Sequence, residues 1–359
     1  MTPPVGPVLL AGAGVTAAIV ALLLSVAATH LARARRQARD ERRKREMTPL
    51  VHALLDDDPT DAVPVPDLVN APGSLDEVVL ELLPQLRGTD REILRRLLAE
   101  RGVVARAVAD LTARKSWRRG RAVALLGSAA GSHHIAVLAA RLQDRSLEVR
   151  CAAARALGKA GDPAAVAYLL PAMSGARALP HGVVGMALLD LGTTALAVLR
   201  GALTGEHTHA RGLIAELLGV HGDVEAAPLL EELLRNADEP SAVRVAAAAA
   251  LGRIGSPRST EPLVRALTTD DDPVLQRTSA EALGRVGDPV AAIPLLAGMA
   301  APDVSVRSAC ADALAGLGAE GRTWLEEVAA GSGQAAGAAR ATLDDLDARP
   351  RRPALAVVR

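Results

Sequence analysis

The sequence predicts an all-α protein, a right-handed α-solenoid of about seven helical repeats preceded by one transmembrane helix. Two observations support this fold class. From residue 117 onward a leucine recurs at intervals of 30 to 33 residues, and an uninterrupted run of apolar or small residues occupies positions 8–28. A steady period of this length is typical of stacked helical units. An apolar run of this length is typical of a helix that spans a bilayer.

The domain organisation follows from these two patterns and from the composition between them. The segment 56–73 is rich in proline and aspartate, which is typical of a tether. Three helices expected at 75–86, 90–100 and 103–113 follow no repeat pattern, and terminal units of solenoids are commonly atypical. We therefore expect an anchor at 1–32, a basic juxtamembrane segment at 33–46, a linker at 47–73, a helical amino-terminal cap at 74–116, the solenoid at 117–345 and a disordered basic tail at 346–359.

The apolar run has the length of a membrane anchor. As a helix its residues would span roughly 31 Å, close to the ~30 Å of a hydrocarbon core. The alternative is a cleaved signal peptide, which needs a basic leader and a shorter apolar run. Residues 1–7 contain no basic side chain, and the charges follow the run instead. The sequence therefore favours an anchor that stays attached.

A basic segment directly after the run predicts the orientation of the chain. Positive charges resist translocation and keep their side of the helix in the cytoplasm. The same charges attract anionic lipids of the inner leaflet. We expect a single-pass protein of the cytoplasmic membrane with its amino terminus outside and its solenoid in the cytoplasm. The basic residues are Arg33, Arg35, Arg36, Arg39, Arg42, Arg43, Lys44 and Arg45.

The charge balance argues against nucleic acid as a partner. Segment 33–46 holds eight of the 41 basic and three of the 41 acidic residues, which leaves 33 and 38 elsewhere, a net charge of −5. A nucleic-acid-binding domain is expected to show the opposite bias. Three aromatic residues, Trp117, Trp324 and Tyr168, offer few platforms for base stacking. A solenoid that binds nucleic acid is therefore the least favoured of three hypotheses about function, after the scaffold and the enzyme subunit described below.

Each repeat has the pattern of two short helices joined by a tight turn. In the second copy the apolar residues fall at i, i+3, i+4, i+7, i+8 and i+11 from Val149, which forms one stripe on a helix. A glycine then ends the helix, at Gly161, Gly255 and Gly287 in the clearest copies. The following Asp-Pro or Ser-Pro pair supplies an N-cap and a first-turn proline for a second helix.

Two of these copies, VRCAAARALGKAGDP at Val149–Pro163 and VRVAAAAALGRIGSP at Val243–Pro257, resemble HEAT repeats, particularly the bacterial subgroup related to phycobilisome lyase repeats. The order of anchor, basic segment, cap and repeats is similar to that of membrane-anchored HEAT proteins of actinobacteria. The resemblance implies an armadillo-like scaffold that binds other proteins. Members of that family are often encoded beside membrane glycosyltransferases, which implies such an enzyme as a partner.

The resemblance also implies a binding surface, because the second helices of HEAT repeats line the concave face. Charged residues of both signs are expected there, which favours a protein partner. The candidates are Arg141, Arg200, Glu231, Arg258, Glu261, Arg265 and Glu326. A second candidate is the irregular start of the third repeat, with Pro180, His181, Gly182 and Gly185, where glycines indicate either close helix contact or a bend that forms a partner groove.

Two other sets of residues are expected to be structural. Arg150, Arg244 and Arg307 share one repeat position and could form a row that binds a partner. We favour ion pairs with an Asp-bearing turn of the adjacent repeat, since partly buried charges are normally paired. Cys310 takes a position that other repeats fill with alanine, so it is expected to be a small core residue rather than a reactive thiol.

The sequence indicates no enzymatic chemistry. It lacks the common nucleophile, phosphate-binding and zinc motifs. The histidine clusters at 133–134 and 206–209 come with no second set of ligands. We therefore expect no catalytic residue, no cofactor, no metal and no small-molecule ligand, and the leading hypothesis is a non-catalytic, membrane-anchored scaffold or adaptor. The alternative is an enzyme subunit or a lyase-like HEAT protein that acts on a partner protein.

Overall fold

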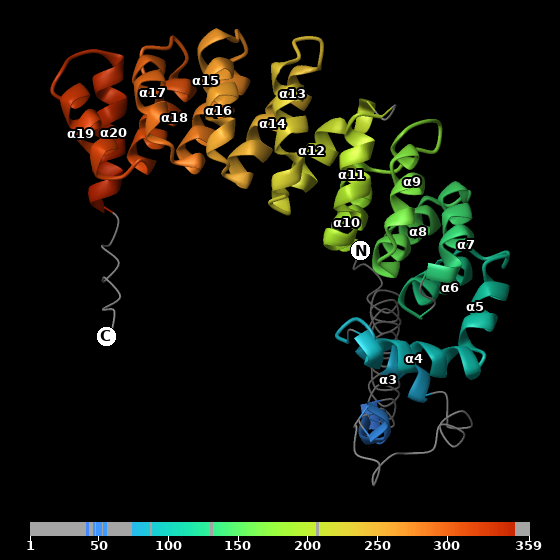
Figure 1. Cartoon of the computed structure of the whole chain (residues 1–359). Helices are drawn as coiled ribbons and strands as arrows, with labels where there is room; N and C mark the ends of the chain where they lie inside the picture. Colours follow the sequence, from blue (N-terminus) through green and yellow to red (C-terminus); the bar gives the residue numbers. More distant parts are fainter. Residues whose placement is uncertain are drawn as a thin grey trace, which may run out of the picture. The chain divides into compact units, whose positions relative to one another are not determined.

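The computed structural model describes residues 74–86, 88–129, 132–205 and 208–348, with short pieces between 41 and 55. Every element in these residues is a helix, so the all-α prediction is confirmed there (Figure 1). The chain divides into two compact units, residues 1–113 with 128–130, and residues 114–127 with 131–359. The predicted anchor, most of the basic segment and the tail from residue 349 lie outside the described residues.

The first unit contains three helices, α3 (Ser74–Leu82), α4 (Gly88–Glu100) and α5 (Val103–Asp110), as the sequence predicted. Leucines from α3 and α4, among them Leu75, Leu94 and Leu98, are completely buried. Arg101, directly after α4, forms an ion pair with Asp76 of α3, and both side chains are largely buried. This pair connects the ends of the two helices.

The second unit consists of seven helical hairpins and a final helix, and the hairpins stand side by side (Figure 1). The first helices of the seven repeats are α6 (Ser116–Ala129), α8 (Leu147–Ala160), α10 (His181–Asp190), α12 (Arg211–Val220), α14 (Ser241–Ile254), α16 (Pro273–Val286) and α18 (Val304–Gly316). The second helices are α7 (Ile135–Ala140), α9 (Val166–Leu169), α11 (Leu196–Leu203), α13 (Ala227–Arg235), α15 (Thr260–Thr269), α17 (Ala292–Gly298) and α19 (Ala319–Ala329). Helix α20 (Gln334–Ala348) follows the seventh repeat.

In the three copies with the clearest pattern, the turn inside the hairpin forms largely as the sequence predicts. The three glycines expected to end first helices, Gly161, Gly255 and Gly287, have φ angles of 74°, 71° and 70°. Asp162 accepts a hydrogen bond from the backbone N–H of Ala164 at 2.8 Å, which is the expected N-cap. Ser256 makes no such bond. After the cap, the chain first makes a short 3-10 turn and then enters the α-helix.

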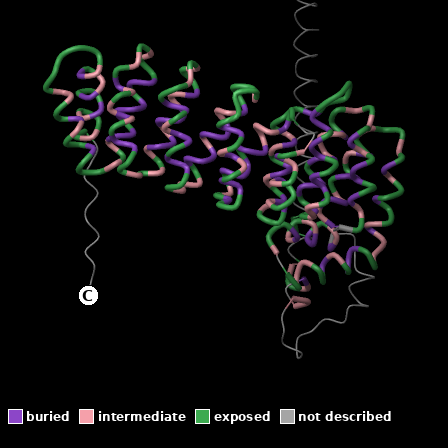
Figure 2. Tube along the Cα trace, turned by 45° about the horizontal axis from the view of Figure 1, so that its top comes forward, coloured by how far each residue is buried: buried purple, intermediate pink, exposed green. Residues whose placement is uncertain are grey.

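The recurring leucines form the centre of the solenoid. All seven, at positions 126, 157, 188, 218, 251, 283 and 314, have no exposed surface. Buried residues run through the interior of the hairpins, and exposed residues lie on their outer sides and loops (Figure 2). The core is made mostly of leucine, alanine and valine, with a few isoleucine and methionine side chains, and the sequence contains no phenylalanine.

Neighbouring first helices touch backbone to backbone at one repeated point. The residue after the recurring leucine is a glycine, and it faces the alanine that precedes the leucine of the next repeat. The pairs are Gly127–Ala156, Gly158–Ala187, Gly219–Ala250, Gly252–Ala282 and Gly284–Ala313. A Cβ added to Gly252 would lie 2.6 Å from the Cα of Ala282, which is closer than real Cβ atoms come. Any side chain at these glycines therefore pushes two helices apart.

The contact between the third and fourth repeats is different. Leu189 and Leu217 occupy the positions that elsewhere hold glycine and alanine, so α10 and α12 cannot meet there backbone to backbone. Instead Gly185 faces Leu213, and a Cβ on Gly185 would lie 3.0 Å from the Cδ1 atom of that leucine. Of the two explanations offered for the glycines of this repeat, close contact between helices holds for Gly185. Gly182 makes no such contact, because nothing lies within 4 Å of a Cβ added to it.

Among the described residues, no single helix is both long and apolar enough to cross a membrane. In the third repeat, His181–Asp190 and Gly192–Leu203 together have sufficient length and apolar character. The chain bends by 106° between these two helices.

Candidate functional site

Arginine occupies one repeat position, seven residues before the recurring leucine, in five of the seven repeats. These residues are Arg119, Arg150, Arg211, Arg244 and Arg307, with His181 and Gln276 in the other two repeats. Arg119 forms a two-pronged ion pair with Asp144, at 2.8 Å from Nε and 2.7 Å from Nη2. Asp144 lies in the loop that leads into the next repeat, so the pair joins two consecutive repeats.

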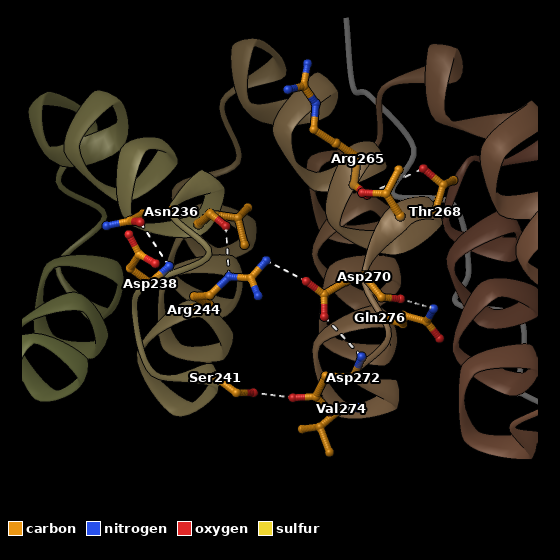
Figure 3. Close-up of polar contacts among 12 residues, drawn as sticks. Asn236, Asp238, Ser241, Arg244, Arg265, Thr268, Asp270, Asp272, Val274 and Gln276 are labelled. Carbon is orange, nitrogen blue, oxygen red and sulfur yellow. Dashed lines mark hydrogen bonds and ion pairs between the residues drawn. The ribbon is translucent and has the colours of Figure 1, made fainter.

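The same connection recurs further along the solenoid. Arg244 donates from Nη2 to Asp270 at 2.5 Å and from Nε to the carbonyl oxygen of Leu234 at 3.2 Å (Figure 3). Arg211 forms an ion pair with Glu239. The expected ion pair with the next repeat is therefore present for Arg244.

The other two arginines of the expected row bind differently. Arg150 donates to the carbonyl oxygen of Asp144 at 3.0 Å. Arg307 donates to the carbonyl oxygens of Ala301 and Pro302 at 2.8 and 2.7 Å. Both arginines therefore form hydrogen bonds with the loop that precedes their own helix and do not pair with the next repeat. Segment 174–180, which follows the second repeat, contains no acidic residue that Arg150 could reach.

Because of the ion pair between Arg119 and Asp144, the free energy of unfolding of the solenoid should decrease at low pH. The hydrogen bond from Arg119 holds the pKa of Asp144 below its ordinary value, helped by the backbone N–H of Ser146 and the charges of Arg119 and Arg141, and burial opposes them. A carboxyl group whose pKa is lowered by folding stabilises the protein above its unfolded-state pKa, near 4, and loses that contribution as the pH falls.

We therefore expect the variant Asp144→Asn to be less stable than the unchanged chain at pH 7. We expect the difference to shrink as the pH is lowered from about 5 towards 2, because the unchanged chain then loses the contribution of this carboxylate. Urea denaturation at a series of pH values measures both effects. Equal differences at pH 7 and at low pH would contradict this role of Asp144.

The structure places the charged residues proposed for the second-helix surface mostly in pairs within the chain. Arg200 of α11 bonds Asp223 and Glu225, both at 2.7 Å. The other interactions are Arg235 with Glu231 at 3.2 Å, Ser259 with Glu231 at 2.8 Å, Arg265 with Glu261 at 2.6 Å and Arg322 with Glu326 at 2.8 Å. Arg258 is exposed, and Arg141 is half-buried near Asp144. Their role in binding a partner stays a prediction.

The second helices of the first three repeats form a surface with very little charge. Segments 135–143, 163–173 and 192–203 contain no acidic residue and two basic ones, Arg141 and Arg200. Between α7 and α9 this surface holds an open groove of about 450 Å³, which we call the alanine groove. It is lined by Ala136, Ala139, Ala140, Leu142, Gln143, Ala167, Tyr168, Pro171 and Ala172.

The sequence does not indicate the alanine groove, because its uncharged lining comes from two segments, 136–143 and 167–172, that only folding brings together. Tyr168 at its rim is 44% exposed, and Val137 beside it on α7 is 37% exposed. Large apolar side chains that remain exposed above a groove commonly mark a contact surface. The available signal was the absence of charged residues from 163–173, although Ala164, Ala167 and Tyr168 are at exposed positions, where charged residues are normally placed.

The two cysteines differ in environment. Cys151 is half-buried, whereas Cys310 is completely buried, and a Cβ added to Gly298 would lie 2.5 Å from its Sγ atom. Burial raises the pKa of the Cys310 thiol to about 12. The thiolate, which is the reactive form, is therefore scarce at neutral pH.

We expect an alkylating reagent at pH 8 to modify no more than one thiol of the folded chain and both thiols in denaturant. Mass spectrometry of the variant Cys151→Ser isolates Cys310, which should stay unmodified until the chain unfolds. Rapid labelling of that variant under native conditions would contradict the packing described for Cys310.

No group of three or more His, Cys, Asp or Glu side chains in the described part of the chain is placed to hold a metal ion. His133 and His209 lie at separate 3-10 turns, and positions 206 and 207 lie outside the described residues. His209 approaches the carbonyl oxygen of Leu170 at 3.4 Å through Nε2.

Comparison with known proteins agrees with this architecture. The family of HEAT repeats matches residues 104–179 and 236–315. No curated protein matches the chain. Among solved structures, the complex of CpcE and CpcF of phycocyanin lyase from Nostoc sp. PCC7120 is 26% identical, with 67% of this chain and 94% of that chain covered and a TM-score of 0.30. Human deoxyhypusine hydroxylase is 20% identical, with 77% and 96% covered and a TM-score of 0.31.

A third similar structure is the karyopherin Kap121p bound to the SUMO protease Ulp1p, which is 14% identical, with 82% of this chain and 40% of that chain covered and a TM-score of 0.48. The family match includes both segments from which the resemblance was inferred, 149–163 and 243–257, and leaves out 180–235, where the irregular third repeat lies. The family match therefore leads to one conclusion: residues 104–179 and 236–315 of this chain are HEAT repeats.

Proposed function

We propose that the chain is a non-catalytic scaffold, anchored in the cytoplasmic membrane by its amino-terminal segment, whose first three repeats bind a protein partner. The observation that carries the proposal is the nearly uncharged surface of the second helices in these repeats. Its two arginines have carboxylates beside them, Asp223 and Glu225 at Arg200 and Asp144 near Arg141. Apart from Gln143, the remaining exposed side chains of segments 135–143, 163–173 and 192–203 are small, apolar or aromatic.

The alanine groove indicates the chemistry of the partner. Methyl groups line most of its walls, so it accepts bulky apolar side chains without unpaired polar groups. Tyr168 adds an amphipathic ring at the rim, a residue type that is enriched in protein interfaces. An amphipathic helix or an extended segment with two or three large apolar side chains fits this surface. A membrane glycosyltransferase, suggested by the family resemblance, is the candidate partner.

A charge placed in the alanine groove tests the partner site. We expect the variant Ala140→Glu with Ala167→Glu to lose its partner, because a buried carboxylate would be left unpaired in the complex. Both alanines are exposed in the free chain, so folding should be unaffected. The matched control is Ala297→Glu, an exposed alanine on the second helix of repeat 6. Quantitative affinity purification from detergent extracts compares them.

The proposal requires that proteins recovered with the unchanged chain also appear with Ala297→Glu and disappear with the double variant. Equal recovery with all three chains would show that the alanine groove binds nothing.

Membrane attachment is tested separately. The full-length chain should stay in the pellet after an alkaline carbonate wash, because a spanning helix is not removed by breaking ionic contacts. A chain that begins at residue 47 should be found in the supernatant. Release of the full-length chain by carbonate would rule out the anchor and leave the partner site to be judged by the groove variants.

A further inference from the structure

The loops between repeats change their net charge along the solenoid. Each loop, with the start of the following first helix, ends at the repeat position that usually holds arginine. Segments 114–119, 143–150 and 174–181 contain seven basic and two acidic residues, a net charge of +5. Segments 237–244, 269–276 and 300–307 contain two basic and six acidic residues, a net charge of −4. This side of the second unit is therefore basic at one end and acidic at the other.

The basic loops form one continuous edge. Arg145 donates from Nη2 to the carbonyl oxygen of Arg114 at 2.9 Å, so the first two loops touch. Arg177 donates from Nη1 to the carbonyl oxygen of Gln143 at 2.6 Å, which joins the third loop. We define the basic edge as five exposed side chains of these loops, namely Arg114, Lys115, Arg118, Arg145 and Arg177.

Two of the acidic loops at the other end, 237–244 and 269–276, are also joined by hydrogen bonds. Asp270 accepts from Arg244, and Asp272 accepts from Ser241, so carboxylates of one loop lie against the preceding repeat (Figure 3). Asp238 and Asp271 in these loops are exposed. The charge difference is thus a property of neighbouring loops at each end of the solenoid and not of scattered residues.

Two large apolar side chains stand exposed within the basic edge. Trp117 in the first turn of α6 is 60% exposed, and Leu147 at the start of α8 is 48% exposed. Tryptophan prefers the boundary between headgroups and acyl chains of a bilayer. Basic side chains with apolar residues between them are the usual composition of surfaces that lie on anionic membranes.

We propose that the basic edge docks on the anionic surface of the bilayer, with Trp117 and Leu147 in the headgroup region. This inference rests on the proposed function, since an anchor and a basic segment bring the first repeats to the membrane. The acidic loops of repeats 5 to 7 are repelled by the same lipids, so the carboxyl-terminal repeats extend away from the bilayer. A nucleic acid fits the edge less well, because Leu147 offers no group for it and the acidic end opposes a long polyanion.

The fluorescence of Trp117 tests the docking in the full-length chain. The variant Trp324→Phe leaves Trp117 as the single tryptophan. This chain is reconstituted into vesicles of phosphatidylcholine alone or mixed with phosphatidylglycerol. Brominated acyl chains quench a tryptophan that reaches the headgroup boundary. We expect a blue-shifted, quenched Trp117 in the anionic vesicles only, and a return to the exposed emission at high salt.

Neutralising the edge should abolish the effect. In a chain that also carries Arg114→Gln, Lys115→Gln, Arg145→Gln and Arg177→Gln, we expect the preference for anionic vesicles to fall by at least about tenfold, since each basic residue near the surface contributes. The matched control, Arg253→Gln with Arg285→Gln, removes exposed positive charges from first helices outside the edge and should leave quenching unchanged. Circular dichroism verifies that both variants are helical.

Equal emission of Trp117 in neutral and anionic vesicles would overturn the docking, and so would salt-sensitive retention of DNA that depends on the same four residues. Failure of the anchor gives a different result. A chain that washes off with carbonate refutes the proposed attachment, while quenching of Trp117 after anionic vesicles are added to that chain still supports the basic edge.

Discussion

Replacing Gly252 with alanine should destabilise the solenoid by about 2 kcal/mol, because the new methyl group would overlap the backbone of the next repeat. Its Cβ would lie 2.6 Å from the Cα and 2.7 Å from the Cβ of Ala282. Forcing α14 and α16 apart costs about 3 kcal/mol, and the better helix propensity of alanine returns about 1 kcal/mol. For a solenoid of this size the midpoint of thermal unfolding should fall by about 6 °C.

The matched control is Gly337→Ala in α20, where nothing lies within 4 Å of an added Cβ. This substitution gains helix propensity without a clash, so it should stabilise the chain by up to about 1 kcal/mol. Urea and thermal denaturation of both variants decide the matter. Equal changes in the free energy of unfolding for Gly252→Ala and Gly337→Ala would contradict the backbone-to-backbone packing of the first helices.

Replacing Arg244 with methionine should cost about 2 kcal/mol, since it leaves a largely buried carboxylate without its partner. The side chains of Arg244 and Asp270 are each 15% exposed, so solvent offsets part of the penalty expected for a fully buried pair. The variant also loses the bond from Arg244 to the carbonyl oxygen of Leu234. Adding Asp270→Asn should restore part of the stability by removing the unpaired charge.

An exposed ion pair provides the control for this prediction. Arg265 and Glu261 lie one turn apart on α15, and their side chains are 61% and 62% exposed. Arg265→Met should therefore change the free energy of unfolding by no more than about 0.5 kcal/mol. Should denaturation show similar losses for Arg244→Met and Arg265→Met, the arginine position would not connect the repeats as described.

The repeat period and the hairpin turns could be predicted from the sequence because they depend on local chemistry. The left-handed glycines, such as Gly161, and the cap at Asp162 need only a few neighbouring residues to be recognised. The break between α19 and α20 lies at the Gly-Ser-Gly of 331–333, which is a local signal of the same kind. The membrane anchor was predicted from the same kind of local pattern, but it lies outside the described residues and stays a proposal.

Features that depend on contacts between repeats were harder to predict. A glycine follows five of the seven recurring leucines, but the alanine that it faces lies about 30 residues away, as in Gly252 and Ala282. Arg119 was not recognised as part of the arginine row, because the row was inferred from the three clearest copies. Its partner Asp144 follows 25 residues later.

The sequence-based candidates for a binding surface and the alanine groove both lie on second helices, but they differ in chemistry. Charged residues were expected to form it, and the structure pairs Arg200, Glu261 and Glu326 with neighbours in the same chain. Pairs four residues apart, such as Glu261 and Arg265, can be read from a sequence, whereas the bond of Arg200 to Asp223 crosses to the next repeat. The uncharged second helices of repeats 1 to 3 are the feature that remains available to a partner.

Crosslinking inside the cell tests the central claim most directly. A photo-reactive phenylalanine derivative in place of Tyr168 lies at the rim of the alanine groove, and the same group in place of Thr268 lies on the exposed face of α15. We expect illumination to crosslink one membrane protein to the chain at position 168 and not at position 268. The double substitution Ala140→Glu with Ala167→Glu should remove this crosslinked product. Crosslinking that is equal at both positions, or unchanged by the groove variant, would contradict this claim.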